Sequence, residues 1–316
     1  MTVLLTTDEI EAARAAIDPT FLDSPLMRHP ALDEALGCAL ALKVETLNPI
    51  RSFKGRGTEV VLASLAPRPA AVVTASSGNF GQGIAWAARR RGIAATVFAP
   101  ESANPLKLEA MRRLGAVVRM VESGRDEADA AREVAIGKNA PLFIEDGAHR
   151  EIAAGAGTIA QEMTGAGVLP DLVLVPIGDG ALVTGIGSWL KATAPATRVI
   201  GVTAVNAPAM ADSVAAGRPV ERQAHTIADG MSITRPVAGA LELVTAAVDE
   251  IIPVGENAFL AAMRLLFEKA GLLAEPSGAA AIAALLEHGA RFRGASVSAI
   301  VTGSNLDARL LPRLLS

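Results

Sequence analysis

Residues 48–57 read Asn-Pro-Ile-Arg-Ser-Phe-Lys-Gly-Arg-Gly and place one lysine, Lys54, between two arginines and beside two glycines. A lysine amine acts as a nucleophile or base only when it is neutral. Burial and neighbouring positive charge both favour that form by lowering the pKa. The pattern therefore makes Lys54 a candidate for amine chemistry, with Arg51 and Arg56 expected to lower its pKa. A solvated basic loop is the plainer interpretation of the same residues.

The other five lysines lack this context. Lys107, Lys191 and Lys269 fall in segments with helical patterns, where solvated side chains are expected. Lys138 lies in a predicted turn. Lys43 ends an apolar strand, where its stem can follow apolar surface while the amine reaches water. None of the five is therefore as strong a candidate for amine chemistry as Lys54.

Three glycine-marked turns, at 76–81, 178–182 and 302–305, follow predicted strands. The first two open a predicted helix, and the free N–H groups of a helix N-terminus attract anions. One turn can then hold a phosphate and another a carboxylate, although glycine and serine are also common in ordinary turns. A G-x-G-x-x-G dinucleotide fingerprint from Gly178 is incomplete because Val183 replaces its last glycine, which leaves NAD a weak alternative.

The elements that would position these groups alternate between short apolar runs and helical patterns. The apolar runs are continuous, as in parallel sheets covered on both faces. We expect strands over 71–74, 95–98, 116–121, 142–144, 172–177, 199–205, 250–254 and 296–302. We expect helices over 81–91, 105–114, 126–136, 182–192, 256–270 and 276–288. Ligands of such sheets bind beyond the carboxyl ends of the strands, where the glycine turns lie.

Composition narrows the class of protein. The chain has 316 residues, 51% hydrophobic and 20% charged, which suits a folded protein with room for two domains. A net charge of −4, with scattered basic residues, predicts no nucleic-acid partner. No signal-peptide pattern or long apolar run is present, so we expect no membrane partner and a cytoplasmic location. The single cysteine, Cys38, is expected to be a small buried hydrophobe.

Six motifs occur along nearly the whole chain: LKVE at 42–45, SFKGRG at 52–57, SSGN at 76–79, the turn at 178–182, EPSG at 275–278 and TGSN at 302–305. In this order they resemble the fold-type II pyridoxal-phosphate (PLP) enzymes, within the serine/threonine dehydratase and serine racemase group. The resemblance implies an α/β fold of two interleaved three-layer domains with mostly parallel sheets, similar to tryptophan synthase β. We expect a small domain over 71–148 and a large PLP-binding domain over 1–70 and 149–316.

The resemblance also implies a role for each matching residue. Lys54 would hold PLP as a Schiff base and act as a base once substrate releases it. Phe53 would pack beside the ring, Thr302 would hydrogen-bond the pyridine nitrogen, and Glu275 belongs to the cofactor-binding segments. Backbone N–H groups expected to bind the phosphate are those of Gly178, Asp179, Gly180, Ala181 and Leu182. The residues expected to bind substrate are Ser76, Ser77, Asn79 and Phe80, with Asn79 also reaching the phenolic oxygen of the ring.

Three features depart from the family's pattern. Asp179 replaces a glycine of the phosphate cup and places a carboxylate near a dianion. Phe80 takes a position that is often histidine, and residues 48–51 replace the common Gln-x-Thr-Gly segment. These departures bear on the identity of the substrate rather than on the cofactor.

The implied activity is α,β-elimination from L-threonine, L-serine or a similar β-hydroxy amino acid, giving a 2-oxo acid and ammonia. Serine racemase and 3-hydroxyaspartate ammonia-lyase are alternatives, and a β-replacement synthase has less support. A racemase needs a second acid–base group, for which Ser77 is the candidate. Its hydroxyl can instead contact the substrate carboxylate or cap the next helix. A non-catalytic ligand-binding protein on the same fold is disfavoured by the intact Lys54.

The resemblance carries expectations about metal, assembly and regulation as well. Relatives bind Mg²⁺ through two acids at positions that correspond to Thr203 and Ala209, and neither residue supplies a carboxylate. We therefore expect no metal site. A homodimer is the family's usual arrangement. The chain ends soon after the last motif, where biosynthetic threonine dehydratases carry a regulatory domain, so inhibition by isoleucine is not expected.

Overall fold

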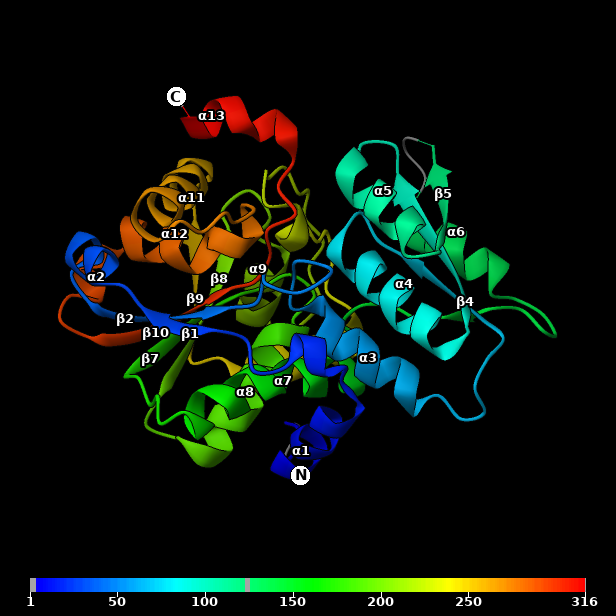
Figure 1. Cartoon of the computed structure of the whole chain (residues 1–316), viewed down its shortest axis with the longest axis horizontal. Helices are drawn as coiled ribbons and strands as arrows, with labels where there is room; N and C mark the ends of the chain where they lie inside the picture. Colours follow the sequence, from blue (N-terminus) through cyan, green and yellow to red (C-terminus); the bar gives the residue numbers. More distant parts are fainter. Residues whose placement is uncertain (1–3, 123–125, 316) are drawn as a thin grey trace.

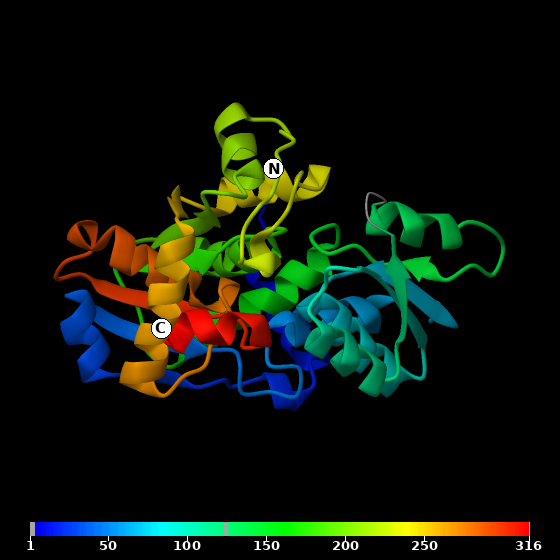
Figure 2. The ribbon, with the colours of Figure 1, turned by 90° about the horizontal axis from the view of Figure 1, so that it is seen from above.

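The structure is a computed structural model that describes residues 4–122 and 126–315. Within those residues the strands form two sheets, one in the order β1-β2-β10-β7-β8-β9 and one in the order β5-β4-β3-β6. Every neighbouring pair is parallel except β1 with β2. The sheets lie in two lobes side by side (Figures 1 and 2). The predicted α/β class with mostly parallel sheets is confirmed.

The helices and strands have the following bounds. The strands are β1 Leu26–Arg28, β2 Ala39–Val44, β3 Ala71–Ala75, β4 Ala94–Pro100, β5 Val117–Val121, β6 Leu142–Phe143, β7 Leu172–Pro176, β8 Arg198–Ala204, β9 Glu250–Val254 and β10 Ser296–Val301. The helices are α1 Thr7–Ala16, α2 Pro30–Leu36, α3 Lys54–Ser64, α4 Asn79–Arg91, α5 Pro105–Arg113, α6 Glu127–Val134, α7 Arg150–Gly165, α8 Ala181–Thr193, α9 Ala209–Ala216, α10 Ala238–Ala247, α11 Glu256–Ala270, α12 Ala280–Glu287 and α13 Leu311–Leu315.

The larger sheet is buried on both faces. On β7, Val173 and Val175 pack into a core with α7 and α8, whereas Leu172 and Leu174 pack into a second core with α11 and α12. Both faces of the strand are therefore apolar, which explains why its sequence is a continuous hydrophobic run. The predicted three-layer arrangement is seen in this lobe.

The smaller sheet repeats this plan with its own helices. Val72 of β3 packs into the core that includes α4, and Val73, the next residue, packs against α6 on the other face. The strands of this sheet lie between Ala71 and Phe143. The division into a small domain over 71–148 and a large domain over the rest stays a prediction.

Helix α3 lies between the lobes and was not predicted by the sequence pattern (Figure 1). Its glycines lower helix propensity, yet they are needed for close packing. A Cβ on Gly57 would lie 2.7 Å from the Ile152 side chain of α7. A Cβ on Gly83 of α4 would lie 2.7 Å from the Thr58 hydroxyl. Tertiary contacts therefore form a helix where local sequence favoured a loop.

Other sequence predictions agree closely with the observed elements. Each predicted strand or helix is present, with ends that shift by a few residues. The helix predicted over 276–288 divides into a 3₁₀ turn, Ser277–Ala279, and α12. Cys38 is free and buried, as expected. Among the described residues, no helix combines the length and apolar character that crossing a membrane requires.

Candidate active site

A cavity of about 210 Å³ receives side chains from both lobes. It is lined by every residue that the motifs predicted: Phe53, Lys54, Ser76, Ser77, Asn79, Phe80, Gly178, Asp179, Gly180, Ala181, Leu182, Glu275 and Thr302. A wider groove of about 1190 Å³ shares part of this lining and leads to the cleft between the lobes. The structure thus brings distant motifs to one place, while the role of each residue remains a prediction.

Lys54 is the first residue of α3, and its position is set by a backbone hydrogen bond and by two aromatic rings. The backbone N–H of Phe53 donates to the carbonyl of Thr302 at 3.0 Å, so the lysine segment is tied to the end of β10. The Lys54 amine lies 5.1 Å from the ring centre of Phe53 and 5.6 Å from that of Phe80. This places the amine in the cavity between two aromatic rings.

Two acids surround the Lys54 amine. Its Nζ forms an ion pair with Asp146 and lies 3.7 Å from Oδ2 of Asp179. Burial by itself lowers the pKa of Lys54, but the charges of Asp146 and then Asp179 offset burial and raise the pKa above its ordinary value. The prediction that neighbouring arginines lower this pKa is therefore wrong, because Arg51 is exposed and Arg56 has other partners.

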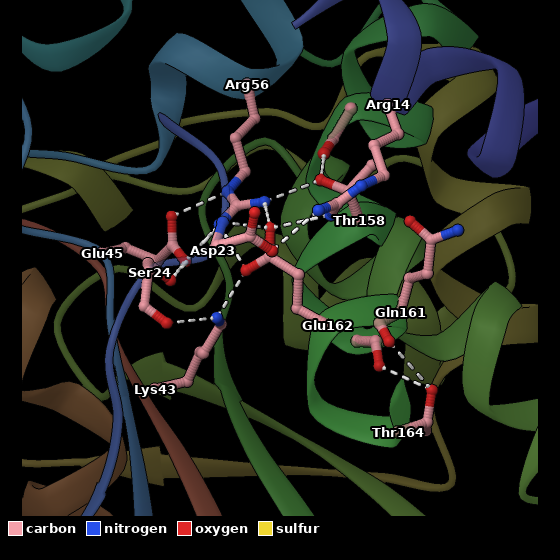
Figure 3. A network of polar contacts seen from close by, with 12 residues as sticks. Arg14, Asp23, Ser24, Lys43, Glu45, Arg56, Thr158, Gln161, Glu162 and Thr164 are labelled. Carbon is pink, nitrogen blue, oxygen red and sulfur yellow. Dashed lines mark hydrogen bonds and ion pairs between the residues drawn. The ribbon is translucent and has the colours of Figure 1, made fainter. Parts of the chain in front are cut away.

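Arg56 lies in a buried network of ion pairs (Figure 3). Its guanidinium lies 2.8 Å from Glu45 and 2.7 Å from Glu162, and it also donates to Thr158 of α7 at 2.9 Å. Lys43 of β2 joins the network by pairing with Glu162. The network links β2, α3 and α7, and so fixes the helix that begins at Lys54.

Two lysine predictions are corrected by the structure. Lys43 is buried with Glu162 rather than reaching water, and Lys107 is 2% exposed rather than solvated. The Lys107 amine lies 2.7 Å from Asp229 and 2.8 Å from Glu275, both in the larger lobe. Both lysines have acid partners that are remote in sequence, which a helical or strand pattern does not reveal.

The turn before α8 packs closely against neighbouring segments of the larger lobe. Gly180 has a φ of 99°, and a Cβ there would overlap the Val244 side chain. A Cβ on Gly178 would overlap the carbonyl oxygen of Gly230. Ala181 and Leu182 begin the helix, and the first N–H groups of a helix have no internal partner. Their binding of a phosphate stays a prediction.

The loop before α4 uses its two serines differently. The Ser76 hydroxyl accepts hydrogen bonds from the N–H groups of Gly78 at 3.1 Å and Gly81 at 3.0 Å, so it stabilises the start of the helix. The Ser77 hydroxyl makes no hydrogen bond with the residues that the structure describes. Helix capping therefore belongs to Ser76, and the hydroxyl that lines the cavity without a protein partner belongs to Ser77.

Asn79 is oriented by two neighbours from the larger lobe. Its Nδ2 donates to Glu275, and its Oδ1 accepts from Asn305 at 2.9 Å. One N–H of the Asn79 amide is left for a ligand. Thr302 donates to the carbonyl of Ser277 at 3.3 Å, a long bond that a better acceptor in the cavity can replace.

Sequence reasoning missed Asp146, Lys107 and Asp229 as members of the site. Lys107 and Asp229 carried no motif, and Asp146 lies in a loop with none.

Among residues 4–122 and 126–315, no group of three or more His, Cys, Asp or Glu side chains is arranged to hold a metal ion. The expected lack of a metal site at Thr203 and Ala209 stays a prediction.

Comparison with known proteins agrees with this geometry. Residues 17–303 match the sequence profile of a family described as pyridoxal-phosphate dependent enzymes. The chain is 33% identical to an L-threonine ammonia-lyase of Thermotoga maritima, over 99% of this chain and 79% of the relative. A solved structure of a threonine deaminase from T.th. is 34% identical, with a TM-score of 0.87 over 96% of this chain and 99% of that one. Maize serine racemase has a TM-score of 0.89 at 28% identity, over 98% of this chain and 96% of that one.

Proposed function

The chain belongs to the family of pyridoxal-phosphate dependent enzymes, and we propose that it is an ammonia-lyase for L-threonine, L-serine or a similar β-hydroxy amino acid. The observation that carries the proposal is Lys54, whose amine lies in a cavity between two aromatic rings and beside a helix N-terminus. The activities named for the Thermotoga maritima relative and the T.th. threonine deaminase support this choice of reaction.

The residues of the cavity fit the cofactor. A Cβ on Gly178 or Gly180 would overlap Gly230 or Val244, so glycine is required for the conformation of the turn that precedes α8. The N–H groups at the start of α8 suit a phosphate. Lys54 supplies the amine that would hold the cofactor, and Asn79 has one free N–H for a ring oxygen. When bound, PLP stabilises the negative charge that develops at the α-carbon of the substrate.

The chain's own residues then bind the substrate and move protons. The start of α4, with Ser77 and Asn79, would bind the substrate carboxylate. Lys54, once displaced by the amine of the substrate, would take the α-proton at Nζ. Loss of the β-hydroxyl with a proton gives water, and the released enamine hydrolyses to a 2-oxo acid and ammonia.

Racemisation is the second candidate and rests on Ser77. Its hydroxyl lines the cavity and has no protein partner among the described residues, so it is available as an acid–base group. Maize serine racemase shares the fold at 28% identity. A serine hydroxyl is a weak base without a partner. We therefore propose elimination as the main activity and racemisation as the minor one.

A substrate panel tests the proposal. L- and D-serine, L- and D-threonine and 3-hydroxyaspartate are each incubated with the PLP-loaded protein, and both ammonia and enantiomer composition are measured. We expect ammonia chiefly from L-threonine or L-serine. Enantiomer exchange faster than ammonia release would replace the lyase with a racemase. A protein that forms no visible absorbance band with PLP would favour the non-catalytic binding module.

We further propose a homodimer in the cytoplasm, with a small domain over 71–148 and a large domain over 1–70 and 149–316. The family's usual arrangement supports the dimer. The net charge of −4 supports the absence of a nucleic-acid partner. Light scattering on the purified protein measures the assembly directly, and a monomer at micromolar concentration would contradict the dimer.

A further inference from the structure

Three charged side chains meet in the cavity, and each comes from a different segment. Lys54 begins α3, Asp146 follows β6, and Asp179 follows β7. The Lys54 amine contacts Asp146 directly and lies 3.7 Å from Asp179. The side chains of Lys54 and Asp146 are 13% and 12% exposed, so water screens their interaction only weakly.

The backbone holds the two acids close together. Gly147, directly after Asp146, has a φ of 79°, and a Cβ there would lie 3.0 Å from both the Cβ and the carbonyl oxygen of Asp179. A side chain at this position would be strained and would press on the neighbouring loop. The loops after β6 and β7 therefore pack against each other through a glycine, and this contact sets the acids beside Lys54.

Asp146 has an oxygen without a partner. Its Oδ1 is buried and makes no hydrogen bond with the residues that the structure describes. Burial is the main cause that raises the pKa of Asp146. Lys54 lowers that pKa and Asp179 raises it, and the result is a pKa of about 7. The direct contact with Lys54 is what favours the charged form of Asp146, against burial and the neighbouring carboxylate.

Other charged groups around the cavity are already paired. Lys107, Asp229 and Glu275 line the same cavity but form ion pairs with one another. The remaining close neighbours of the Lys54 amine are the rings of Phe53 and Phe80. Among the described residues, Asp146 is thus the anion in direct contact with the Lys54 nitrogen, and Asp179 is the next.

We propose that Asp146 is the counter-ion of the Lys54 nitrogen and holds a proton there both in the free lysine and after the lysine joins the cofactor. Asp146 is a positioning residue in this proposal, since it acts through Lys54. The inference rests on the proposed function for the presence of the cofactor. Cofactor uptake near neutral pH should be slow, because only the neutral amine attacks an aldehyde. During the reaction, Asp146 would stabilise the ammonium formed when Lys54 takes the α-proton.

The substitution Asp146→Asn tests the proposal without substrate. In the PLP-loaded protein, the visible absorbance band is titrated with pH to follow the proton on the lysine–cofactor nitrogen. An adjacent carboxylate stabilises the protonated form. Its removal should lower that pKa by about one pKa unit or more. In the cofactor-free protein, a larger neutral fraction of Lys54 should speed PLP uptake at pH 7 by about tenfold.

Glu145→Gln is the matched control, since it removes the neighbouring carboxylate of the same loop, which pairs with Arg132. The control should leave both the titration and the uptake rate unchanged. An Asp146→Asn protein that binds PLP but titrates like the wild type overturns the proposal. If Asp146→Asn does not fold or load, Asp179→Asn replaces it. Because of its 3.7 Å separation, this second variant should shift the titration downward by a smaller amount, and no shift overturns the proposal.

Failure of the proposed function gives a different pattern. If the protein loads PLP and shows the expected shifts but releases no ammonia from any substrate, the counter-ion proposal stands and the lyase assignment is wrong. If the protein releases ammonia from L-threonine but Asp146→Asn shifts neither the titration nor the uptake rate, the lyase assignment stands and the counter-ion proposal is wrong.

Discussion

Two buried lysines line the same cavity, and their partners separate their roles. Lys107 is held by two acids, 2.7 and 2.8 Å from its amine, and bridges the lobes. Lys54 lines the cavity beside two aromatic rings and the turn that precedes α8. The geometry therefore favours Lys54 as the cofactor lysine, although both side chains are largely withdrawn from water.

Borohydride reduction of the PLP-loaded protein tests this assignment. We expect peptide mapping to find the pyridoxyl group on the peptide that contains Lys54. Lys54→Ala should bind PLP without a stable covalent product and should lose nearly all ammonia release, because the amine both holds the cofactor and moves the α-proton. The label on Lys107 or Lys43 would contradict the assignment.

We propose that Ser77 sets the balance between elimination and racemisation. Its hydroxyl has no protein partner among the described residues, whereas the Ser76 hydroxyl stabilises the start of α4. Ser77→Ala should abolish exchange between L- and D-serine while leaving substantial elimination from the L-enantiomer. Chiral chromatography and an ammonia assay on the same reaction measure the two rates. Persistent exchange in Ser77→Ala would assign the second acid–base group to another residue.

The sequence predicted which residues gather in the site far better than it predicted their charges. The motifs that line the cavity are local strings, so they are visible in one sequence. Asp146 is not visible in this way, because it lies 92 residues from Lys54 and only the fold brings them together. The same reason explains the error for Lys107, whose partner Asp229 is 122 residues away. Long-range ion pairs reversed the predicted direction of the Lys54 pKa.

At the scale of helices and strands, α3 shows how buried charge positions the reactive lysine. Arg56 lies two residues after Lys54 and is fully buried against Glu45 and Glu162. Burial raises the pKa of Glu162, but hydrogen bonds and charge from Arg56 and Lys43 lower it overall to about 2. Glu162 is therefore ionised at neutral pH, and its charge depends on the two cations for stabilisation.

Arg56→Met should destabilise the protein by about 3–5 kcal/mol, because it leaves two buried carboxylates without their main partner. Urea unfolding at pH 7 measures this loss. Arg222→Met is the control, since Arg222 is 48% exposed and pairs with Asp212 at the surface. The control should change the free energy of unfolding by less than about 1 kcal/mol. Equal losses of unfolding free energy in both variants would mean that the buried network stabilises the protein no more than a surface ion pair does.

The secondary structure could be predicted where periodicity is strong and local. Continuous apolar runs identified the buried strands, because both faces of each sheet are covered by helices. Helix α3 escaped prediction because Gly55 and Gly57 weaken the local signal. Both glycines accept close neighbours: a Cβ on Gly55 would overlap the Phe21 ring, and one on Gly57 would press on Ile152. Packing between distant elements outweighed propensity there.

For the whole molecule, polar contacts join the two lobes across the cleft. Lys107 of α5 pairs with Asp229 and Glu275 of the larger lobe, and Asn79 of α4 donates to the same Glu275. Glu275 is 1% exposed, so its charge has little access to water. Burial lowers the pKa of Lys107, but Glu275 and Asp229 offset it and raise that pKa overall. Lys107 therefore stays protonated at neutral pH.

Lys107→Met should loosen the contact between the lobes, because a buried carboxylate that loses its cation gains by reaching water. We expect faster hydrogen exchange in α5 and in the turn Asp229–Met231, a lower thermal midpoint, and a KM for L-threonine raised several-fold. Lys191→Met is the control. It removes a partly exposed lysine near the C-terminal end of α8, which pairs with Asp249, and it should change neither hydrogen exchange, nor the thermal midpoint, nor KM. If Lys107→Met lowers the thermal midpoint but leaves exchange at both sides of the cleft and KM unchanged, Lys107 stabilises its own lobe and does not hold the two lobes together.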